Sequence, residues 1–337
     1  MTGTGRPHRI HQPRPPERHR APSALVTGGS RGLGLLIARQ LARRGCAVTL
    51  AARDAEELER AAALLREWTG TAPHVVVCDV RDRAAVRELM RTTHARDGLD
   101  VVIANAGVIQ VGPVAAIGAE EFDDALDVIF RGTLHTALEA LPYLRRSGGR
   151  LGLIGSVGGL LGVPHLLPYS CAKAAVGALG EGLHAEYRAA GVGVTTVHPG
   201  LLRTGSDRQA EFGGDTGAES GWFSALAGAP LLSMDGERAA RRIVDAVLRR
   251  RARLVLTPAA RAAQLGHGVA PGLTTRLSAL AARALPEPGG DGTVRQGHEA
   301  GKPAHPLARR LRDWGSALND RAAARSNQTR PGPRTSS

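Results

Sequence analysis

Short apolar segments alternate with amphipathic helical patterns from residue 23 to about residue 258. The apolar segments are rich in Val, Leu, Ile and Ala, and the stretches between them repeat their apolar residues with helical spacing. Strands that are apolar on both sides are typical of a parallel sheet whose two faces are covered. We therefore predict an α/β fold with strands at residues 23–27, 47–52, 75–80, 99–104, 150–154, 192–197 and 253–257.

A glycine-rich turn joins the first predicted strand to the first predicted helix. Strand, turn and helix in this order form the first half of a dinucleotide-binding unit, because glycine lets the backbone approach a pyrophosphate at the helix N-terminus. The expected fold is accordingly a single doubly wound, Rossmann-type parallel sheet with helices on both faces. The residues of this turn that we expect to bind a cofactor are Gly28, Ser30, Arg31, Gly32, Leu33 and Gly34.

The residues after the second strand indicate which dinucleotide is preferred. Enzymes that select NAD place an acidic residue at the end of this strand, where it binds the ribose 2′-hydroxyl. Here Ala52 ends the strand and Arg53 follows it, while Arg31 belongs to the same neighbourhood. Guanidinium groups bind a 2′-phosphate that an acid would repel, so the sequence predicts NADP(H) in preference to NAD(H). Two solvent-facing arginines in an arginine-rich chain remain the alternative.

Ser156, Tyr169 and Lys173 are the candidate catalytic residues. Tyr169 and Lys173 are four positions apart and share one face of a predicted helix. A neighbouring ammonium favours the phenolate, so we expect Lys173 to lower the pKa of Tyr169 toward neutrality. The Ser156 hydroxyl, which follows a predicted strand, can hold a carbonyl or alcohol oxygen while the proton moves. A solvated tyrosine–lysine pair is the alternative if no nicotinamide site accompanies it.

Several motifs follow the glycine-rich turn in order along the chain. Asp79 and Asn105-Ala106-Gly107 end two predicted strands, and Pro199-Gly200 with Thr204 ends a later one. Together with the turn and Tyr169-x-x-x-Lys173, these motifs resemble the short-chain dehydrogenase/reductase family over residues 23–258. The resemblance implies an NADP(H)-dependent oxidoreductase that interconverts a carbonyl and a secondary alcohol.

The resemblance also implies a role for each matching residue. Tyr169 is expected to be the acid/base and Ser156 to orient the substrate oxygen. Lys173 is expected to bind the nicotinamide ribose and to lower the tyrosine pKa. The further cofactor contacts that the resemblance implies are Asp79, Val80, Asn105, Ala106, Gly107, Tyr169, Lys173, Pro199, Gly200 and Thr204.

One position departs from the family pattern. The family has an asparagine three residues before the glycine at position 132, whereas this chain has Ile129. The asparagine supports a helix irregularity whose carbonyl binds a water in the proton relay from the lysine. An NADP(H)-binding sensor or scaffold protein with little catalysis is therefore the alternative to an enzyme.

Composition and charge exclude several other classes. The formal net charge of +13 is concentrated in the two ends of the chain, so the basic residues favour at most non-specific binding of polyanions by the tails. Aromatic residues make up only 3% of the chain, which argues against a base-stacking surface. The cysteines Cys46, Cys78 and Cys171 are scattered, so we expect no metal site and a cytoplasmic protein.

Three segments lie outside the predicted sheet. Residues 1–22 are expected to be a disordered basic tail. Residues 205–236 are the segment that covers the substrate in the family, and their apolar content favours a lipophilic carbonyl or alcohol. Residues 259–337 form a C-terminal extension, helical over 259–285 and then poorly ordered apart from a short amphipathic helix near 307–318. The helical part has three alternatives: packing on the protein, on a second subunit of a homo-oligomer, or on a membrane surface.

Overall fold

The computed structural model describes residues 20–229, 232–289, 293–300, 319, 322–323 and 325–328. Within them, one sheet has seven strands, and all its pairings are parallel. The predicted doubly wound α/β fold is therefore confirmed. In sheet order the strands are β11 (Arg253–Val255), β7 (Gly193–His198), β6 (Arg150–Ile154), β4 (Val101–Ala104), β1 (Ser23–Thr27), β2 (Ala47–Ala52) and β3 (His74–Val77).

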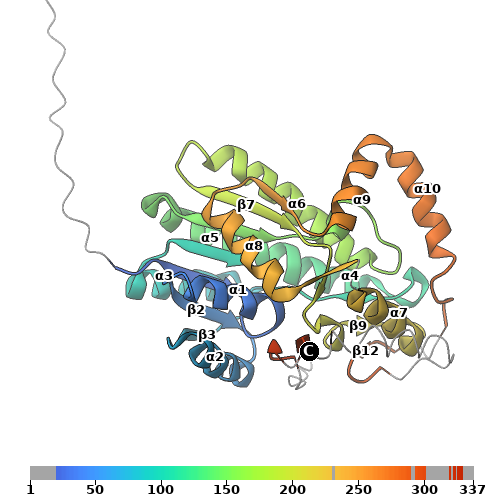
Figure 1. The fold of residues 1–337 in the computed structure, drawn as a ribbon, viewed down its shortest axis with the longest axis horizontal. Coiled ribbons are helices and arrows are strands. Elements are labelled where there is room, and N and C mark those ends of the chain that lie inside the picture. Colours follow the sequence, from blue (N-terminus) through green and yellow to red (C-terminus); the bar gives the residue numbers. More distant parts are fainter. Residues whose placement is uncertain are drawn as a thin grey trace, which may run out of the picture.

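Helices cover both faces of the sheet, as Figure 1 shows. On one face, α1 (Gly32–Ala42), α2 (Ala55–Thr69) and α8 (Gly236–Leu248) enclose one apolar core. On the other, α3 (Arg83–Asp97), α5 (Gly132–Ser147) and α6 (Leu167–Tyr187) enclose a second. Because β1 and β4 are buried along their whole length, their side chains supply both cores, as the unbroken apolar runs predicted.

The strand order reverses between β1 and β4. β1 pairs with β2 on one side and with β4 on the other, and Val26 lies opposite Leu50 and Ile103. In open α/β sheets, ligands bind outside the carboxyl ends of the strands at such a reversal. The residues that follow β1, β4 and β6 are therefore at the edge where a cofactor is expected.

The helical stretch before β6 is interrupted. It consists of α4 (Ala119–Ala125), a π-helical segment η2 (Leu126–Arg131) and α5. Ile129 lies in the π-helical segment and is fully buried. The irregularity that asparagine supports in the family is thus present here with isoleucine in its place.

Residues 205–236, the lid segment, form a small layer of their own. They contain η4 (Ser206–Arg208), β9 (Glu211–Phe212), α7 (Thr216–Gly228) and β10 (Ser233–Asp235). β9 pairs with β5 (Gln110–Val111) and β12 (Arg295–Gln296), and β10 pairs with β8 (Leu201–Arg203). Two 3₁₀ turns, η1 (Val114–Ala116) and η3 (Val157–Gly159), complete the connections.

The helical part of the extension projects from the sheet domain (Figure 1). It consists of α9 (Pro258–Val269) and α10 (Pro271–Ala282), and α10 buries none of its residues. α10 contacts α9, where Nδ1 of His267 lies 2.8 Å from the Thr274 hydroxyl oxygen, and it adds no buried residue to the core of the sheet domain. No helix among the described residues has the length and apolar content needed to cross a membrane. The exposed aliphatic side chains of the pair are Leu265, Val269, Leu273, Leu277 and Leu280.

The two ends of the chain are described only in part. Residues 1–19 of the tail predicted over 1–22, and the predicted short helix near 307–318, lie outside the described residues. Arg20 pairs with Asp100 at 2.8 Å. Contrary to the expectation of little order, residues 293–300 include β12, and the described residues between 319 and 328 contact the sheet domain.

We expect Gly180→Ala to destabilise the fold. A Cβ at Gly180 in α6 would overlap the side chain of Thr196 in β7, so the helix would have to move away from the sheet. Overpacking of this kind costs about 1–3 kcal/mol in the free energy of unfolding, which urea denaturation would measure. Gly182→Ala is the matched control, because a Cβ there meets nothing within 4 Å. It should stabilise the helix by up to about 1 kcal/mol; equal stabilities of the two variants would contradict this packing.

Candidate active site

The glycine-rich turn at the carboxyl end of β1 is tightly folded. Gly28 and Gly32 have φ angles of 62° and 54°, which favour glycine. A Cβ on Gly34 would overlap the carbonyl oxygen of Gly28. Arg31 begins α1 without a side-chain cap, and Leu33 in the first turn packs partly on the core. Since no side chain caps the helix, its N-terminal N–H groups fit a dinucleotide pyrophosphate.

Asn105 attaches this turn to the central strand. Its Nδ2 donates to the carbonyl oxygens of Thr27 at 3.2 Å and Gly28 at 3.0 Å. The Thr27 hydroxyl in turn accepts from the backbone N–H of Asn105 at 3.1 Å. Ala106 lies so close that a Cβ on Gly28 would be 2.8 Å from its Cα. The predicted cofactor neighbours Asn105 and Ala106 therefore also position the glycine-rich turn.

Glu57 is a residue of this site that the sequence did not reveal. Its carboxylate accepts hydrogen bonds from the Ser30 hydroxyl at 2.7 Å and from Arg31 at 2.9 Å, and it is almost fully buried. The only signal for Glu57 in the sequence is its position in the first turn of α2, three residues after the capping residue Asp54. Arg31 is thus already paired, whereas Arg53 is exposed and no hydrogen bond or ion pair from it is found among the described residues.

Asp79 follows β3 at the same edge of the sheet. Burial would raise its pKa, but the hydrogen bonds and charge of Arg81 outweigh burial and lower the pKa below its ordinary value. The Nη2 of Arg81 lies 2.7 Å from the aspartate. Val80 is buried, and its carbonyl contacts Nδ1 of His135 at 3.0 Å. Asp79 therefore remains ionised and fixed in position.

Ser156, Tyr169 and Lys173 converge at the carboxyl end of β6. The Nζ of Lys173 donates to the carbonyl oxygen of Ile154 at 2.7 Å and lies 5.6 Å from the centre of the Tyr169 ring. Ser156 hydrogen-bonds with the Tyr169 side chain. Its Oγ also accepts from the N–H of Gly158 at 3.1 Å, which orients the hydroxyl. The structure thus brings together the three residues that the sequence predicted as a group.

The protonation of this group differs from the sequence-based expectation. Burial raises the pKa of Tyr169, and its hydrogen bond with Ser156 offsets only part of the rise. Burial also lowers the pKa of Lys173 to about 8. The predicted lowering of the tyrosine pKa by Lys173 is therefore wrong for this structure, because removal of the phenol from water is the larger effect.

Ile129 lies near Gly107, a residue of the predicted cofactor site. A Cβ on Gly107 would lie 3.7 Å from Ile129 Cγ1 and 3.7 Å from Lys173 Nζ, so both side chains are neighbours of this glycine. Gly132, at the end of η2, allows close approach to Val80, since a Cβ there would be 2.5 Å from the valine Cγ2. Isoleucine therefore places hydrocarbon, rather than an amide, at this position of the π-helical segment.

The loop after β7 closes the site from the other side. The carbonyl of Pro199 accepts from the N–H of Val157 at 2.8 Å, which joins this loop to the residue after Ser156. Gly200 packs closely on Thr257, and Thr204 is buried. His198 packs in the strand end: it is fully buried, and burial lowers its pKa to about 4.

The lid segment is attached to the loop before the catalytic helix. The buried carboxylate of Glu219 in α7 contacts Nδ1 of His165 at 2.8 Å and accepts from Nε1 of Trp222 at 2.6 Å. His165 has a φ of 61°, which is unusual for a residue with a side chain. Phe212 and Phe223 of this segment pack on each other in a small buried cluster. The lid segment therefore has its own core.

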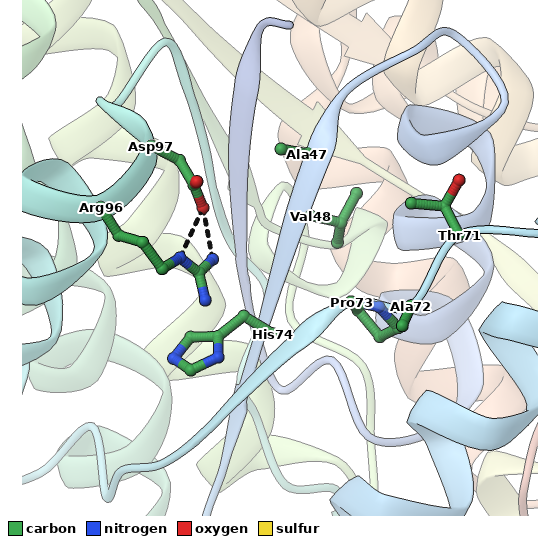
Figure 2. A pocket seen from close by; sticks show the side chains of 8 residues that line it. All are labelled: Ala47, Val48, Thr71, Ala72, Pro73, His74, Arg96 and Asp97. Carbon is green, nitrogen blue, oxygen red and sulfur yellow. Dashed lines mark hydrogen bonds and ion pairs between the residues drawn. The ribbon is translucent and has the colours of Figure 1, made fainter.

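A pocket of about 270 Å³ lies elsewhere, as Figure 2 shows. It is located where β2 and β3 begin, at the opposite edge of the sheet from the candidate catalytic residues. Arg96 and Asp97, which line it, hydrogen-bond to each other at 2.7 Å. Its lining residues are Ala47, Val48, Thr71, Ala72, Pro73, His74, Arg96 and Asp97, and none belongs to the predicted site.

The sequence of this chain is similar to a protein-family model and to several known proteins. A family model described as short chain dehydrogenase matches residues 22–212. An uncharacterized oxidoreductase of Staphylococcus aureus (strain N315) is 37% identical over 183 residues, which cover 54% of this chain and 78% of the relative. A similar protein of Staphylococcus epidermidis is 31% identical over 192 residues, covering 56% of this chain and 82% of the relative.

Solved structures share the fold. Levodione reductase superposes with a TM-score of 0.62 at 24% identity, covering 75% of this chain and all of that chain. An alcohol dehydrogenase from the archaeon Thermococcus sibiricus, solved in complex with 5-hydroxy-NADP, superposes with a TM-score of 0.57 at 27% identity. That match covers 70% of this chain and 95% of the archaeal enzyme.

We expect the buried Lys173 to make stability depend on pH. Its pKa is 10.5 when exposed and about 8 here, so between these values the unfolded chain binds the extra proton and the free energy of unfolding rises with pH. Relative to Lys173→Met, the native protein should gain up to about 3 kcal/mol between pH 7.5 and pH 10.5. Urea denaturation of both proteins across this range measures the difference, and a difference that does not change with pH would contradict the burial of the charge.

Proposed function

Because this chain belongs to the short chain dehydrogenase family, we propose that it transfers a hydride between NADP(H) and a carbonyl or secondary alcohol. It is an oxidoreductase of a family that uses NAD(P)(H) and acts on small molecules. The observation that carries the proposed reaction is the meeting of Ser156, Tyr169 and Lys173 at the sheet edge that also bears the glycine-rich turn.

The proposed roles follow from the protonation of the group. A nicotinamide coenzyme would supply the hydride for reduction or accept it in oxidation. Tyr169 carries a raised pKa and is therefore protonated at neutral pH, so its phenol donates a proton to the carbonyl oxygen during reduction. The Ser156 hydroxyl, held by the N–H of Gly158, hydrogen-bonds the same oxygen. Lys173, with a pKa of about 8, is positioned to return a proton to the tyrosine.

The preference for NADP(H) is proposed to depend mainly on Arg53. Arg31 is neutralised by the buried Glu57, whereas Arg53 is exposed at the end of β2. A guanidinium there can bind the 2′-phosphate, and no acidic residue occupies the end of the strand to receive a 2′-hydroxyl. The 5-hydroxy-NADP in the Thermococcus sibiricus enzyme supports this preference.

The substrate is proposed to be a lipophilic carbonyl or alcohol that enters beneath the lid segment. Trp222 remains half-buried in this segment, next to His165 in the loop before the catalytic helix. Their ring centroids are 6.5 Å apart, in an edge-to-face arrangement. An apolar side chain beside the catalytic loop favours an apolar substrate over a charged one.

Ile129 favours a second candidate function, an NADP(H)-binding sensor with little catalysis. Its side chain has no hydrogen-bonding group with which to support the proton relay of the family, and it lies near Gly107, as Lys173 does. Against this, the π-helical segment forms without the asparagine. The enzyme is therefore the function that we favour.

We expect Tyr169→Phe to reduce carbonyl turnover at least about 1,000-fold, since the general acid contributes on this scale. NADPH affinity should stay within about twofold, because the variant keeps the ring and loses only the hydroxyl. A panel of aldehydes and ketones, followed by NADPH absorbance, measures turnover, and fluorescence titration measures binding. If the native protein and the Ile129→Asn variant both bind NADPH but reduce no compound in the panel, the NADP(H)-binding sensor becomes the favoured function. Undiminished turnover by Tyr169→Phe would reject the role of the phenol.

We expect Arg53→Ala to weaken NADPH binding about tenfold and to leave NADH binding unchanged. The variant loses one hydrogen-bonding partner of the charged 2′-phosphate. Hydrogen bonds to charged groups contribute about 1.5–3 kcal/mol, and we expect the low end of this range because Arg53 is exposed. Titration of both coenzymes measures the ratio of the dissociation constants. Arg91→Ala is the matched control, because Arg91 pairs with Glu88 on an exposed face of α3. An equal loss for NADPH and NADH would contradict the proposed preference.

A further inference from the structure

The last described residues of the chain lie against the glycine-rich turn. We call the described residues 319, 322–323 and 325–328 the C-terminal strap. Figure 1 shows this end of the chain below α1, close to α2. Asn327 is 297 positions from Ser30 in sequence, and its Nδ2 nevertheless donates to the carbonyl oxygens of Ser30 at 2.9 Å and Glu57 at 3.1 Å.

The strap uses a backbone donor of the turn itself. The N–H of Gly32, at the start of α1, donates to the carbonyl oxygen of Ser326 at 2.8 Å. The Gln328 amide fills the space beside Gly32, where a Cβ would lie 2.8 Å from its Nε2. An N–H at this helix terminus is a donor suited to a pyrophosphate oxygen, and here a peptide carbonyl oxygen accepts in its place.

The strap also contacts the opposite wall of the proposed cofactor site. The Ser326 hydroxyl donates to the carbonyl oxygen of Thr204 at 2.7 Å. Asn319 accepts from the N–H of Gly205 at 2.9 Å, and a Cβ on that glycine would overlap Ala323. The strap therefore connects the loop after β7 with the start of α1, the two sides between which the dinucleotide is expected.

The side chains of the strap are buried at this contact. Asn319, Ala323, Ser326 and Gln328 are each at most 4% exposed. The closed arrangement is nevertheless incomplete, because no hydrogen-bond partner for the buried Oε1 of Gln328 is found among the described residues. A buried acceptor without a partner costs free energy, which keeps the closed state from being overly stable.

We propose that the C-terminal strap is an intramolecular plug that occupies the pyrophosphate position and must leave before the coenzyme binds. This inference rests on the proposed dinucleotide site. The Gly32 N–H has a single hydrogen, so the strap carbonyl and a phosphate oxygen compete for it. The apparent affinity for the coenzyme is then reduced by the fraction of molecules in which the strap is open.

The test is the NADPH affinity of full-length variants. Asn327→Ala removes two hydrogen bonds that hold the strap closed, and Gln328→Ala removes the amide beside Gly32. Asn327→Ala should lower the NADPH dissociation constant at least about fivefold, and Gln328→Ala should lower it in the same direction. Thr275→Ala on α10, which has only a local hydrogen bond, should change nothing. Unchanged or weaker binding in the Asn327 variant would overturn the plug.

A measurement on the native protein is independent of how the variants fold. Hydrogen exchange of the strap amides should become faster when NADP⁺ is added at saturation, because the displaced strap is exposed to water. Slower exchange would mean that the strap folds over the bound coenzyme, which would overturn the proposal.

The outcomes separate this proposal from the reaction itself. Tighter NADPH binding without carbonyl turnover would reject the reaction and retain the plug. Carbonyl turnover by the native protein, with no change in the NADPH dissociation constant of the strap variants, would retain the reaction and reject the plug. Failure of the native protein and both variants to bind either coenzyme would reject the plug together with the cofactor site.

Discussion

The candidate active site depends on one buried contact, the ammonium of Lys173 with the carbonyl oxygen of Ile154. This contact joins α6 to the last residue of β6, so the helix that carries Tyr169 is held at the strand end that carries Ser156. This contact has an electrostatic cost. Removing the ammonium from water destabilises its charged form, which lowers the pKa of Lys173. Burial also raises the pKa of the Tyr169 phenol, so both groups are protonated near neutral pH.

A second constraint is the supply of N–H donors at the start of α1. The turn that precedes the helix is held by Asn105, and no side chain caps the helix. An unpaired donor at a helix terminus has to find an acceptor, and in this chain that acceptor is the carbonyl oxygen of Ser326. The feature that suits the turn to a pyrophosphate thus also suits it to the chain's own C-terminal residues.

Much of the site could be predicted because its residues follow strand ends. Asp79, Asn105 and Ser156 come directly after apolar runs, and parallel strands bring their carboxyl ends to one edge. The state of these residues could not be predicted in this way. Whether the pKa of Tyr169 is raised or lowered depends on how completely the fold removes the phenol from water. The ion pair of Arg31 depends on Glu57, and in the sequence Glu57 looks like any acidic residue in the first turn of a helix.

The sequence by itself determined the parallel sheet, the glycine-rich turn and the order of Ser156, Tyr169 and Lys173, because periodicity and short spacing encode such local features. Only the tertiary structure decided that Glu57 neutralises Arg31, that Ile129 and Lys173 both lie near Gly107, and that Asn327 reaches Ser30. These contacts join segments far apart in the chain. No periodic pattern records them, since they arise from the geometry of packing around the finished sheet.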